Sequence, residues 1–489
     1  MMTQQELEKY LWGAATTLRG TIDAGDYKQY IFPLLFFKRI SDVYDEEFSN
    51  ALAESDGDMD YAAFSENHHF QVPAEAHWND VRETTVNIGI ALQNAMRAIE
   101  QANPDTLYGI FGDASWTNKE RLSDGMLTNL IEHYSQHKLN LSNVPDDKLG
   151  NAYEYLIKEF ADDSGHTAAE FDTNRTVVKL MTMIMDPQPG ESVYDPTCGS
   201  GGLLLNCALH LKEEGKEYRT LKLYGQEINL LTSAIARMNM FMHGIEEFDI
   251  VRGDTLANPG LLENDELKKF NVILANPPYS IKSWDRKTFV SDPYGRNIWG
   301  TPPQGCADYA FQQHIQKSLD LDSGRSISLW PHGILFRDTE AEMRRKMIEQ
   351  DLVECIIGLG PNLFYNSPME ACLLITKTNK ETSKKGKILF INAVNEVKQE
   401  KTMGYLEQQH IDKIFAAYKN FTSQDSFALL VDTKDVLARN ANMAINLYIR
   451  PDSLSDKAEV SFSNTYEQWQ HSSDSLKKSM ETLFKKLAQ

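Results

Sequence analysis

The sequence has little positive charge for its size. Lys and Arg number 49 against 70 Asp and Glu among 489 residues, which leaves a formal net charge of −21. Proteins that bind nucleic acid alone are usually basic. This balance therefore predicts weak binding of DNA or RNA unless a local basic patch or a partner protein contributes.

Long apolar runs are missing as well. The sequence has no stretch of about 18 consecutive apolar residues, the length that a transmembrane helix needs. The first residues, MMTQQELEKYLWG, carry acidic side chains where a secretory signal would be basic and then apolar. We therefore expect neither a signal peptide nor contact with a membrane.

Cysteine is scarce and scattered. An odd number of cysteines without a C-x-x-C pair predicts a reduced, cytoplasmic protein with neither a structural zinc site nor another bound metal. The five are Cys198, Cys207, Cys306, Cys355 and Cys372.

The remaining composition is that of a globular protein, and its patterns change along the chain. Apolar residues recur at helical spacing in the first part, for example in YIFPLLFFKRISDVYDEEF, and strand signals are nearly absent there. A polar stretch around Gly165 follows a further predicted helix, KLGNAYEYLIKEFA. We predict an α-helical domain over residues 1–145, a second domain over 146–425 and a C-terminal segment over 426–489.

Strand-like runs alternate with helix-like runs from Phe171 onward. This alternation predicts an α/β fold with a doubly wound, mainly parallel sheet, in which ligands bind at the carboxyl ends of strands. The predicted strands are Val193–Tyr194, Leu221–Glu227, Asp249–Arg252, Val272–Ala275, Ser326–Trp330, Val353–Gly358, Cys372–Thr376 and Ile388–Ile391.

A glycine-rich loop follows the first predicted strand in VYDPTCGSGGLL, residues 193–204. Glycines allow a tight turn and close approach of the backbone to a ligand. A Lys-Ser or Lys-Thr pair does not follow, so the loop is not a phosphate-binding P-loop. The alternative is a turn that only packs a helix on a strand.

Three acidic residues end three consecutive predicted strands. Asp195 precedes the glycine loop, Glu227 ends the second strand in LYGQEIN, and Asp254 follows the third in VRGDTL. An acid at the second position can accept hydrogen bonds from both ribose hydroxyls. Together the three predict a ligand that carries a nucleoside, and NAD and S-adenosylmethionine both remain open at this point.

In the stretch NVILANPPYS, residues 271–280, a predicted buried strand ends at Asn276-Pro277-Pro278-Tyr279. We call this rigid polar turn the hook. The side-chain oxygen of Asn276 and the carbonyl of Pro277, held by Pro278, form two acceptors for the two hydrogens of an amino group. Tyr279 offers a π-face for the base that carries the amine. Such a site favours methyl transfer to an exocyclic adenine amine, and a base in a duplex must be flipped out to reach it.

The pair DPTCGSGG and NPPY resembles the amino-group adenine methyltransferases. The helical first part, LGNAYEYLIKEFA, ADYAFQQH and PNLFYNSPMEACLLI make the chain more similar still to methylation subunits of type I restriction-modification systems. The resemblance covers most of the chain. It implies a Rossmann-like class I S-adenosylmethionine-dependent fold and transfer of a methyl group to the N6 amino group of adenine in double-stranded DNA.

The resemblance also implies roles for individual residues. Asp195 would face the methionine amino group, Glu227 the ribose and Asp254 the adenine of the cofactor. Phe364 or Tyr365 would stack on the flipped base opposite Tyr279, although core packing is an alternative for both. The expected cofactor set is Phe171, Thr173, Asp195, Thr197, Gly199, Ser200, Gly201, Glu227, Asp254 and Asn276. The chain departs from the family at Asp172 and Asn174, where an aromatic residue and a proline are frequent.

Contacts with DNA and with partner subunits complete the expectation. The loop SIKSWDRKTFVSDPYGR is locally basic, and Lys282, Arg286, Lys287 and Arg296 are candidates for contacting the DNA backbone. The resemblance implies a specificity subunit, with two methylation subunits for each, and a restriction subunit in the full complex.

The tail supplies a candidate docking element. Its apolar residues Tyr466, Trp469, Leu476, Met480, Leu483 and Leu487 follow a heptad register that Ser473 interrupts. An isolated helix of about 20 residues is marginal in water, so the stripe is expected to pack on the chain's own N-terminal helices or on a partner's helix.

Two other functions remain open at this stage. Methyltransferases that modify glutamine in translation factors also use an NPPY hook, although they are shorter and lack the helical N-terminal part. A non-catalytic assembly subunit is the other alternative, and the intact hook and three acids argue against it.

Overall fold

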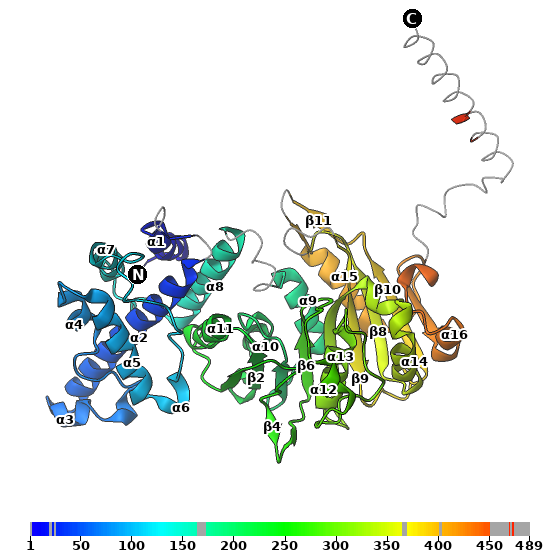
Figure 1. Ribbon diagram of the computed structural model, residues 1–489, viewed down its shortest axis with the longest axis horizontal. Helices are drawn as coiled ribbons and strands as arrows, with labels where there is room; N and C mark the ends of the chain where they lie inside the picture. The colour runs from blue at the N-terminus through cyan, green and yellow to red at the C-terminus, as the bar shows by residue number, and fades with distance from the viewer. Residues whose placement is uncertain are drawn as a thin grey trace, which may run out of the picture.

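The computed structural model describes residues 2–18, 22–23, 26–163, 173–363, 369–400 and 403–449, together with residues 469, 472 and 473. A helical part formed by the first third of the chain lies beside an α/β part formed by the rest (Figure 1). Among these residues no helix combines the length and the apolar character that crossing a membrane requires.

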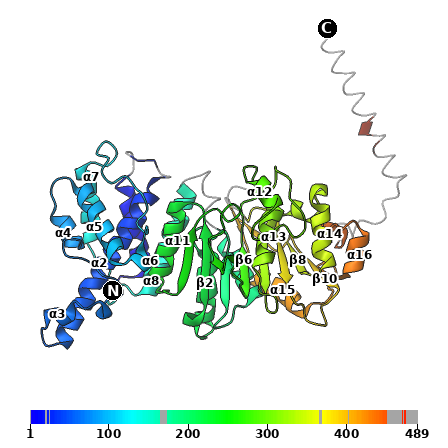
Figure 2. The same ribbon diagram turned by 60° about the horizontal axis from the view of Figure 1, so that its bottom comes forward.

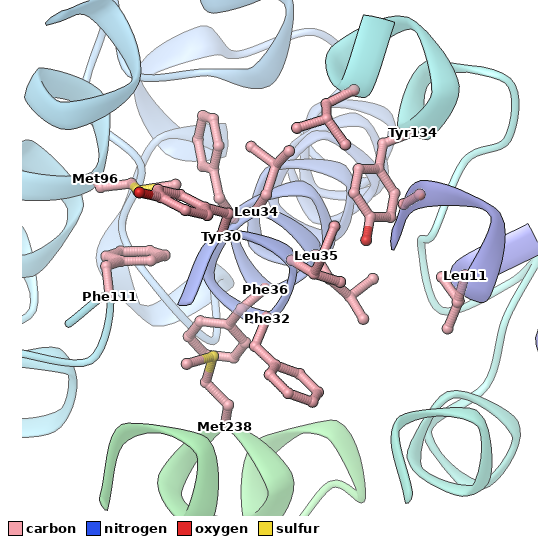
Figure 3. Close-up of a cluster of buried hydrophobic side chains, with 14 of the residues drawn as sticks. Leu11, Tyr30, Phe32, Leu34, Leu35, Phe36, Met96, Phe111, Tyr134 and Met238 are labelled. Carbon is pink, nitrogen blue, oxygen red and sulfur yellow. The ribbon is translucent and has the colours of Figure 1, made fainter. Parts of the chain in front are cut away.

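The helical part is built around the long helix α2 (Lys28–Glu54). Residues 30–37 of this helix are all buried. A helix that is apolar on every side must be enclosed by its neighbours. Figure 3 shows Phe32, Leu35 and Phe36 of α2 inside that enclosure. The surrounding helices include α1 (Gln4–Thr16), α4 (Trp78–Glu83), α5 (Ile88–Ala102), α7 (Asp124–Ser135) and α8 (Asp146–Asp163).

The same apolar cluster joins the helical part to the α/β part. Met238 of α11 (Leu230–Met242) lies next to Phe32 and Phe36 (Figure 3). The rings of Phe36 and Phe241 stack with centroids 5.9 Å apart. The two parts therefore share a core across α2, α8 and α11.

A nine-stranded sheet forms the centre of the α/β part, and two small two-stranded sheets, β4-β5 and β11-β12, accompany it. The strand order of the nine-stranded sheet is β13-β10-β8-β9-β7-β6-β1-β2-β3. The strands are β1 (Ser192–Asp195), β2 (Lys222–Glu227), β3 (Phe248–Arg252), β6 (Val272–Ala275), β7 (Arg325–Pro331), β8 (Val353–Leu359), β9 (Ala371–Lys377), β10 (Lys387–Ala393) and β13 (Ala428–Asp432). Most neighbours are parallel, and β9 runs antiparallel to both β7 and β8. The α/β prediction and all eight predicted strands are confirmed.

The edge strand β13 was not predicted. It pairs antiparallel with β10 and lies within the predicted C-terminal segment, so the sheet extends beyond residue 425. The predicted domain boundaries themselves remain a prediction.

Helices cover both faces of the sheet (Figure 2). Along β10, Leu389 and Ile391 pack in one apolar cluster, while Ile388 and Phe390 pack in another. Strands buried on both faces read as continuous apolar runs in the sequence, which is why they were recognisable. The first cluster includes α9 (Arg175–Met185), α10 (Gly202–Glu213) and α15 (Gln408–Asn420), and the second includes α13 (Asp308–Ser318) and α14 (Ala341–Glu349).

Candidate active site

The glycine loop after β1 is held by hydrogen bonds to the acids around it. Asp195 is buried, and its carboxylate accepts the backbone N–H of Thr197 at 3.0 Å. Glu227, at the end of neighbouring β2, accepts the N–H of Gly199 at 3.1 Å. The carboxylates of Asp195 and Glu227 are thereby brought to the same loop, as predicted from their places at two strand ends.

Gly201 is required where the loop enters α10. Its φ of +83° lies in the left-handed region, which favours glycine. A Cβ at this position would lie 2.9 Å from the Cε atom of Met240 in α11. The loop therefore comes close to α11, and the side-chain amide of Asn239 in that helix donates to the carbonyl of Ser200 at 3.1 Å.

The third acid, Asp254, follows β3 and is half-buried. Its carboxylate accepts the N–H groups of Leu256 and Ala257 at 2.9 and 3.1 Å, so it caps the turn of its own loop. The backbone N–H of Gly253 donates to the carbonyl of Glu227, which joins this loop to the end of β2. All three acids thus lie along the carboxyl edge of β1, β2 and β3.

The electrostatics of this edge favour a ligand that carries hydrogen-bond donors and positive charge. Burial raises the pKa of Asp195 to about 8, and the charge of Glu227 adds to the shift. An ionised carboxylate accepts hydrogen bonds and donates none, so an ammonium group and sugar hydroxyls, which donate, are suitable partners for this edge. The residues present therefore fit the amino-acid and ribose portions of S-adenosylmethionine.

The hook begins where β6 ends. Asn276 is half-buried, and its side-chain oxygen accepts the hydroxyl proton of Tyr279 at 2.8 Å. Its side-chain NH2 donates to the hydroxyl of Thr173 at 3.1 Å. These two hydrogen bonds connect the hook to Thr173, which the sequence predicts to bind the cofactor. Burial raises the pKa of Tyr279, so this hydroxyl stays protonated and can donate.

The hook and the acids meet at one edge of the sheet because β1 and β6 are parallel neighbours. Tyr194 of β1 pairs with Ile273 of β6, which places the residues after both strands side by side. The amine hook thus lies next to the edge that fits a nucleoside-bearing ligand, as the strand-end argument predicted.

One predicted DNA contact is wrong. Only 2% of the Arg296 side chain is exposed, and its guanidinium pairs with the buried carboxylate of Asp292. The same guanidinium donates to the carbonyls of Thr255 and Leu256, both at 2.8 Å. Arg296 is therefore a buried structural residue that cannot reach a phosphate. The local charge count missed this because it takes no account of burial.

The other basic candidates lie at the surface. Lys282 and Lys287 are exposed. Arg286 is half-buried, and its Nε donates to the carbonyl of Pro302 at 2.7 Å, which leaves part of the guanidinium open. These three residues remain predicted phosphate contacts.

Some predicted residues lie outside the described part of the chain. They are Phe171, Phe364, Tyr365 and, except for Trp469, the apolar residues of the tail. Their predicted roles stand as sequence expectations.

Two residues near the site, Asn174 and Asp308, were not predicted from the sequence as part of it. Asn174, noted only as a departure from the family, caps α9: its side chain accepts the N–H of Thr176 and donates to the carbonyl of Gly404. Asn before an apolar periodic run is a sequence signal for such a cap. The second is Asp308 in ADYAFQQH, whose carboxylate accepts the N–H of Ser280 at 2.7 Å. No local pattern indicates that contact.

Most of the chain matches known protein families. Residues 144–457 match the family described as N-6 DNA Methylase, and residues 7–134 match the HsdM N-terminal domain. The MjaVIII methylase subunit, a type I restriction enzyme subunit of Methanocaldococcus jannaschii, is 30% identical over 470 residues, which cover 91% of this chain and 78% of that protein. The MpnII methylase subunit of Mycoplasma pneumoniae is 28% identical and covers 94% of this chain and 92% of its own length.

A solved structure agrees with these relatives. The crystal structure of a type I restriction-modification methyltransferase subunit from Streptococcus thermophilus has a TM-score of 0.78 to this chain at 29% sequence identity. The match covers 92% of this chain and 100% of that one. The likeness extends over both the helical part and the α/β part.

Proposed function

The chain belongs to the N-6 DNA methylase family as an adenine-specific methylase subunit of the type I restriction enzyme kind, and on that premise we propose how its site works. In this proposal the carboxyl edge of β1, β2 and β3 binds S-adenosylmethionine, and the hook after β6 binds the adenine amine. The family match favours DNA as the substrate over the two alternatives, a glutamine methyltransferase of proteins and a non-catalytic assembly subunit.

The observation that carries the proposal is the juxtaposition of the two half-sites. Asp195 and Glu227 face the glycine loop, and Asn276 leaves the strand that pairs with β1. The cofactor would supply an electrophilic methyl group. Asp195 would pair with its amino group, Glu227 would accept from its ribose, and Asp254 would contact its adenine.

The hook would hold the accepting nitrogen. The oxygen of Asn276 and the carbonyl of Pro277 accept the two amine hydrogens, which draws the nitrogen lone pair out of conjugation with the ring. The Asn276 oxygen accepts the hydroxyl of Tyr279 in the structure, and the second lone pair of the same oxygen would accept a hydrogen of the incoming amine. Catalysis would then depend mainly on holding the amine and the methyl group in the right geometry, because the methyl group of the cofactor is already reactive.

The target base would reach the hook by leaving the duplex. Tyr279 would stack on it from one side, and Phe364 or Tyr365 from the other. Lys282, Arg286 and Lys287 follow directly after the hook and would contact the DNA backbone nearby.

An acidic chain needs help to hold DNA. Its net charge of −21 opposes a polyanion, so we propose that a specificity subunit supplies sequence recognition and most of the phosphate contacts. Two copies of this chain for each specificity subunit, with a restriction subunit in the full complex, are part of the same proposal, as is a cytoplasmic location.

Methyl transfer from labelled S-adenosylmethionine tests the function directly. The chain is assayed with DNA and with protein substrates, each with and without the specificity subunit. We expect label only in DNA, on adenine N6, and only when the specificity subunit is present. Label on protein glutamine would favour the first alternative, and no transfer in any mixture would favour an assembly role.

The tail tests the partner proposal. Deleting residues 464–489 removes the heptad stripe, and we expect a folded chain that binds S-adenosylmethionine but does not join the specificity subunit or methylate DNA. Size-exclusion chromatography of the truncated chain with that subunit measures the loss. A complex of normal size and activity would show that docking occurs elsewhere.

A further inference from the structure

A buried charged cluster lies directly behind the hook. Asp308, at the first position of α13, and Glu340, just before α14, are both fully buried. The guanidinium of Arg337 pairs with both carboxylates. Its Nε lies 2.7 Å from Oε2 of Glu340. Asp308 begins α13, whereas Arg337 and Glu340 lie in one turn just before α14, and the reaction as proposed above uses none of the three.

The cluster reaches the hook through Ser280. The N–H of Ser280 donates to Asp308 at 2.7 Å, and its hydroxyl lies 3.4 Å from Nη1 of Arg337. Ser280 has a φ of +51°, a left-handed conformation that few residues other than glycine, Asn and Asp adopt. A strained residue of this kind persists only where its surroundings hold it, and here two charged groups do so.

The hydrogen bond from the Ser280 N–H to Asp308 also orients the preceding residue, Tyr279. The Ser280 N–H belongs to the planar peptide unit that leaves Tyr279. Fixing that plane fixes the backbone torsion of Tyr279, and with it the direction in which the ring and hydroxyl point. The Tyr279 hydroxyl in turn meets the Asn276 oxygen at 2.8 Å, so a shift at Ser280 would move both parts of the hook.

The segment leading to Asp308 also holds the chain beyond Ser280. The side-chain amide of Gln304 donates to the carbonyls of Lys282 and Trp284 at 3.0 and 3.1 Å. The indole N–H of Trp284 donates back to the carbonyl of Gln304 at 3.1 Å. Residues 302–308 therefore grip the loop after the hook at several points, and Asp308 is the point nearest to Tyr279.

A metal ion is not needed to explain the cluster. Cys306, Asp308 and Glu340 present ligand-type atoms close to one another. The positive charge between the two carboxylates is already supplied by Arg337. One Asp308 oxygen meets Arg337 and the other the Ser280 N–H, so both oxygens have partners.

We propose that Asp308, held by Arg337, is a positioning residue that fixes the turn at Ser280 and thereby aims Tyr279 and Asn276 at the target base. This inference rests on the proposed function, because the hook must receive a base for its aim to matter. Asp308 touches neither substrate nor cofactor and acts only through the hook.

Two variants separate its hydrogen bond from its charge. Asp308→Ala removes both, and Arg337 keeps Glu340 as its partner, so no buried charge is left unpaired. Asp308→Asn keeps an oxygen that can accept the Ser280 N–H and loses the charge. Glu354→Gln is the matched control, because Glu354 is also fully buried, beside Lys377 and the Tyr418 hydroxyl, in β8 of the same sheet.

Methyl transfer is measured with the specificity subunit present. A misplacement of about 1 Å at a reacting group can cost about a hundredfold, and we expect a loss of that order in kcat/KM for DNA with Asp308→Ala. Asp308→Asn should recover much of the loss. S-adenosylmethionine affinity should stay unchanged in both variants, and Glu354→Gln should resemble the unaltered chain.

A double-mutant cycle distinguishes aiming from general damage. If Asp308 acts through Tyr279, then Asp308→Ala should cost much less in a Tyr279→Ala background than in the unaltered chain. Equal losses in both backgrounds, or normal kcat/KM in Asp308→Ala, would overturn the proposal.

Amide hydrogen exchange keeps the test independent of the reaction. In the free chain, Asp308→Ala should speed exchange in residues 276–284, and Glu354→Gln should not. Unchanged exchange would show that Asp308 does not hold the turn at Ser280. If the unaltered chain fails to methylate adenine while exchange responds as expected, the proposed function is wrong, but the inference that Asp308 holds the hook in place is supported.

Discussion

The two halves of the site are held in place in different ways. On the cofactor side, each acid accepts backbone N–H groups from its own loop or from the loop of the adjacent strand, as Asp195 does with Thr197 and Glu227 with Gly199. On the amine side, Asn276 bonds to Thr173, 103 residues earlier, and Ser280 to Asp308, 28 residues later. The first half is supported by neighbouring strand ends, and the second by distant segments.

This difference has a consequence for mutations. A change on the cofactor side should affect mainly the ligand that touches the altered residue. A change among the supports of the hook should alter the reaction without touching either substrate. Arg296 belongs to both halves, since it follows the hook loop and donates to carbonyls just after Asp254.

Arg296→Ala should have the largest effect, and on stability. Removing one partner of a buried ion pair leaves the Asp292 carboxylate uncompensated, which typically costs about 3–5 kcal/mol. Denaturant unfolding measures the loss, with Lys287→Ala as the exposed control, expected to stay within about 0.5 kcal/mol. If the Arg296→Ala chain had normal stability and bound DNA more weakly, the prediction that Arg296 contacts a phosphate would be supported after all.

Asn276→Ala should nearly abolish methyl transfer. Losing one preorganised hydrogen-bonding group at a reacting centre typically lowers kcat by about 10²–10³-fold, and here the lost oxygen is one of the two proposed acceptors. Calorimetry on the same variant should show S-adenosylmethionine affinity close to that of the unaltered chain, which would limit the role of Asn276 to the amine and exclude its expected cofactor contact. Near-normal turnover would exclude the amine-clamp mechanism.

Asp195→Asn should change the pH dependence of cofactor binding. The pKa of Asp195 is raised to about 8 in the folded chain, above its unfolded value, so its protonated form stabilises the free protein at low pH and this contribution is lost as pH rises toward 8. A cationic ligand needs the charged form, so affinity should rise with pH up to about 8, by at most about tenfold per pH unit.

Calorimetric titrations between pH 6 and about 8.5 measure this slope in both chains. The Asn variant should bind more weakly at pH 8 and show a flatter profile. Glu227→Gln serves as a comparison, because removing the neighbouring charge should make Asp195 easier to ionise. An identical slope with and without Asp195 would move the cofactor's amino group elsewhere.

Tyr279 should show the smallest effects, divided between its ring and its hydroxyl. Tyr279→Ala should weaken capture of the base by about 1–3 kcal/mol, the usual contribution of one base–aromatic stack. Tyr279→Phe keeps the ring and loses the bond to Asn276, which should cost about 0.5–1.5 kcal/mol. Binding to DNA with a fluorescent adenine analogue at the target position measures both, and equal losses would show that stacking is not the role of the ring.

The sequence anticipated much of the sheet and less of the site's support. All eight predicted strands are present in the sheet. They could be predicted because strands buried on both faces appear in the sequence as apolar runs between loop residues. The edge strand β13 was not predicted, because it lies beyond residue 425, where the predicted α/β domain ends. The place of β9, antiparallel between β7 and β8, could not be read from local patterns, since pairing joins strands from separate stretches of chain.

The same division applies to single residues. The sequence by itself determined the three acids, the glycine loop and the NPPY hook, because each depends on which residue directly follows a strand, and parallel strands end at one edge. Only the tertiary structure decided that Arg296 is buried, that Thr173 bonds to Asn276 and that Asp308 holds Ser280. Burial and hydrogen bonds between distant segments depend on how the whole chain packs, and no spacing within a short stretch carries that information.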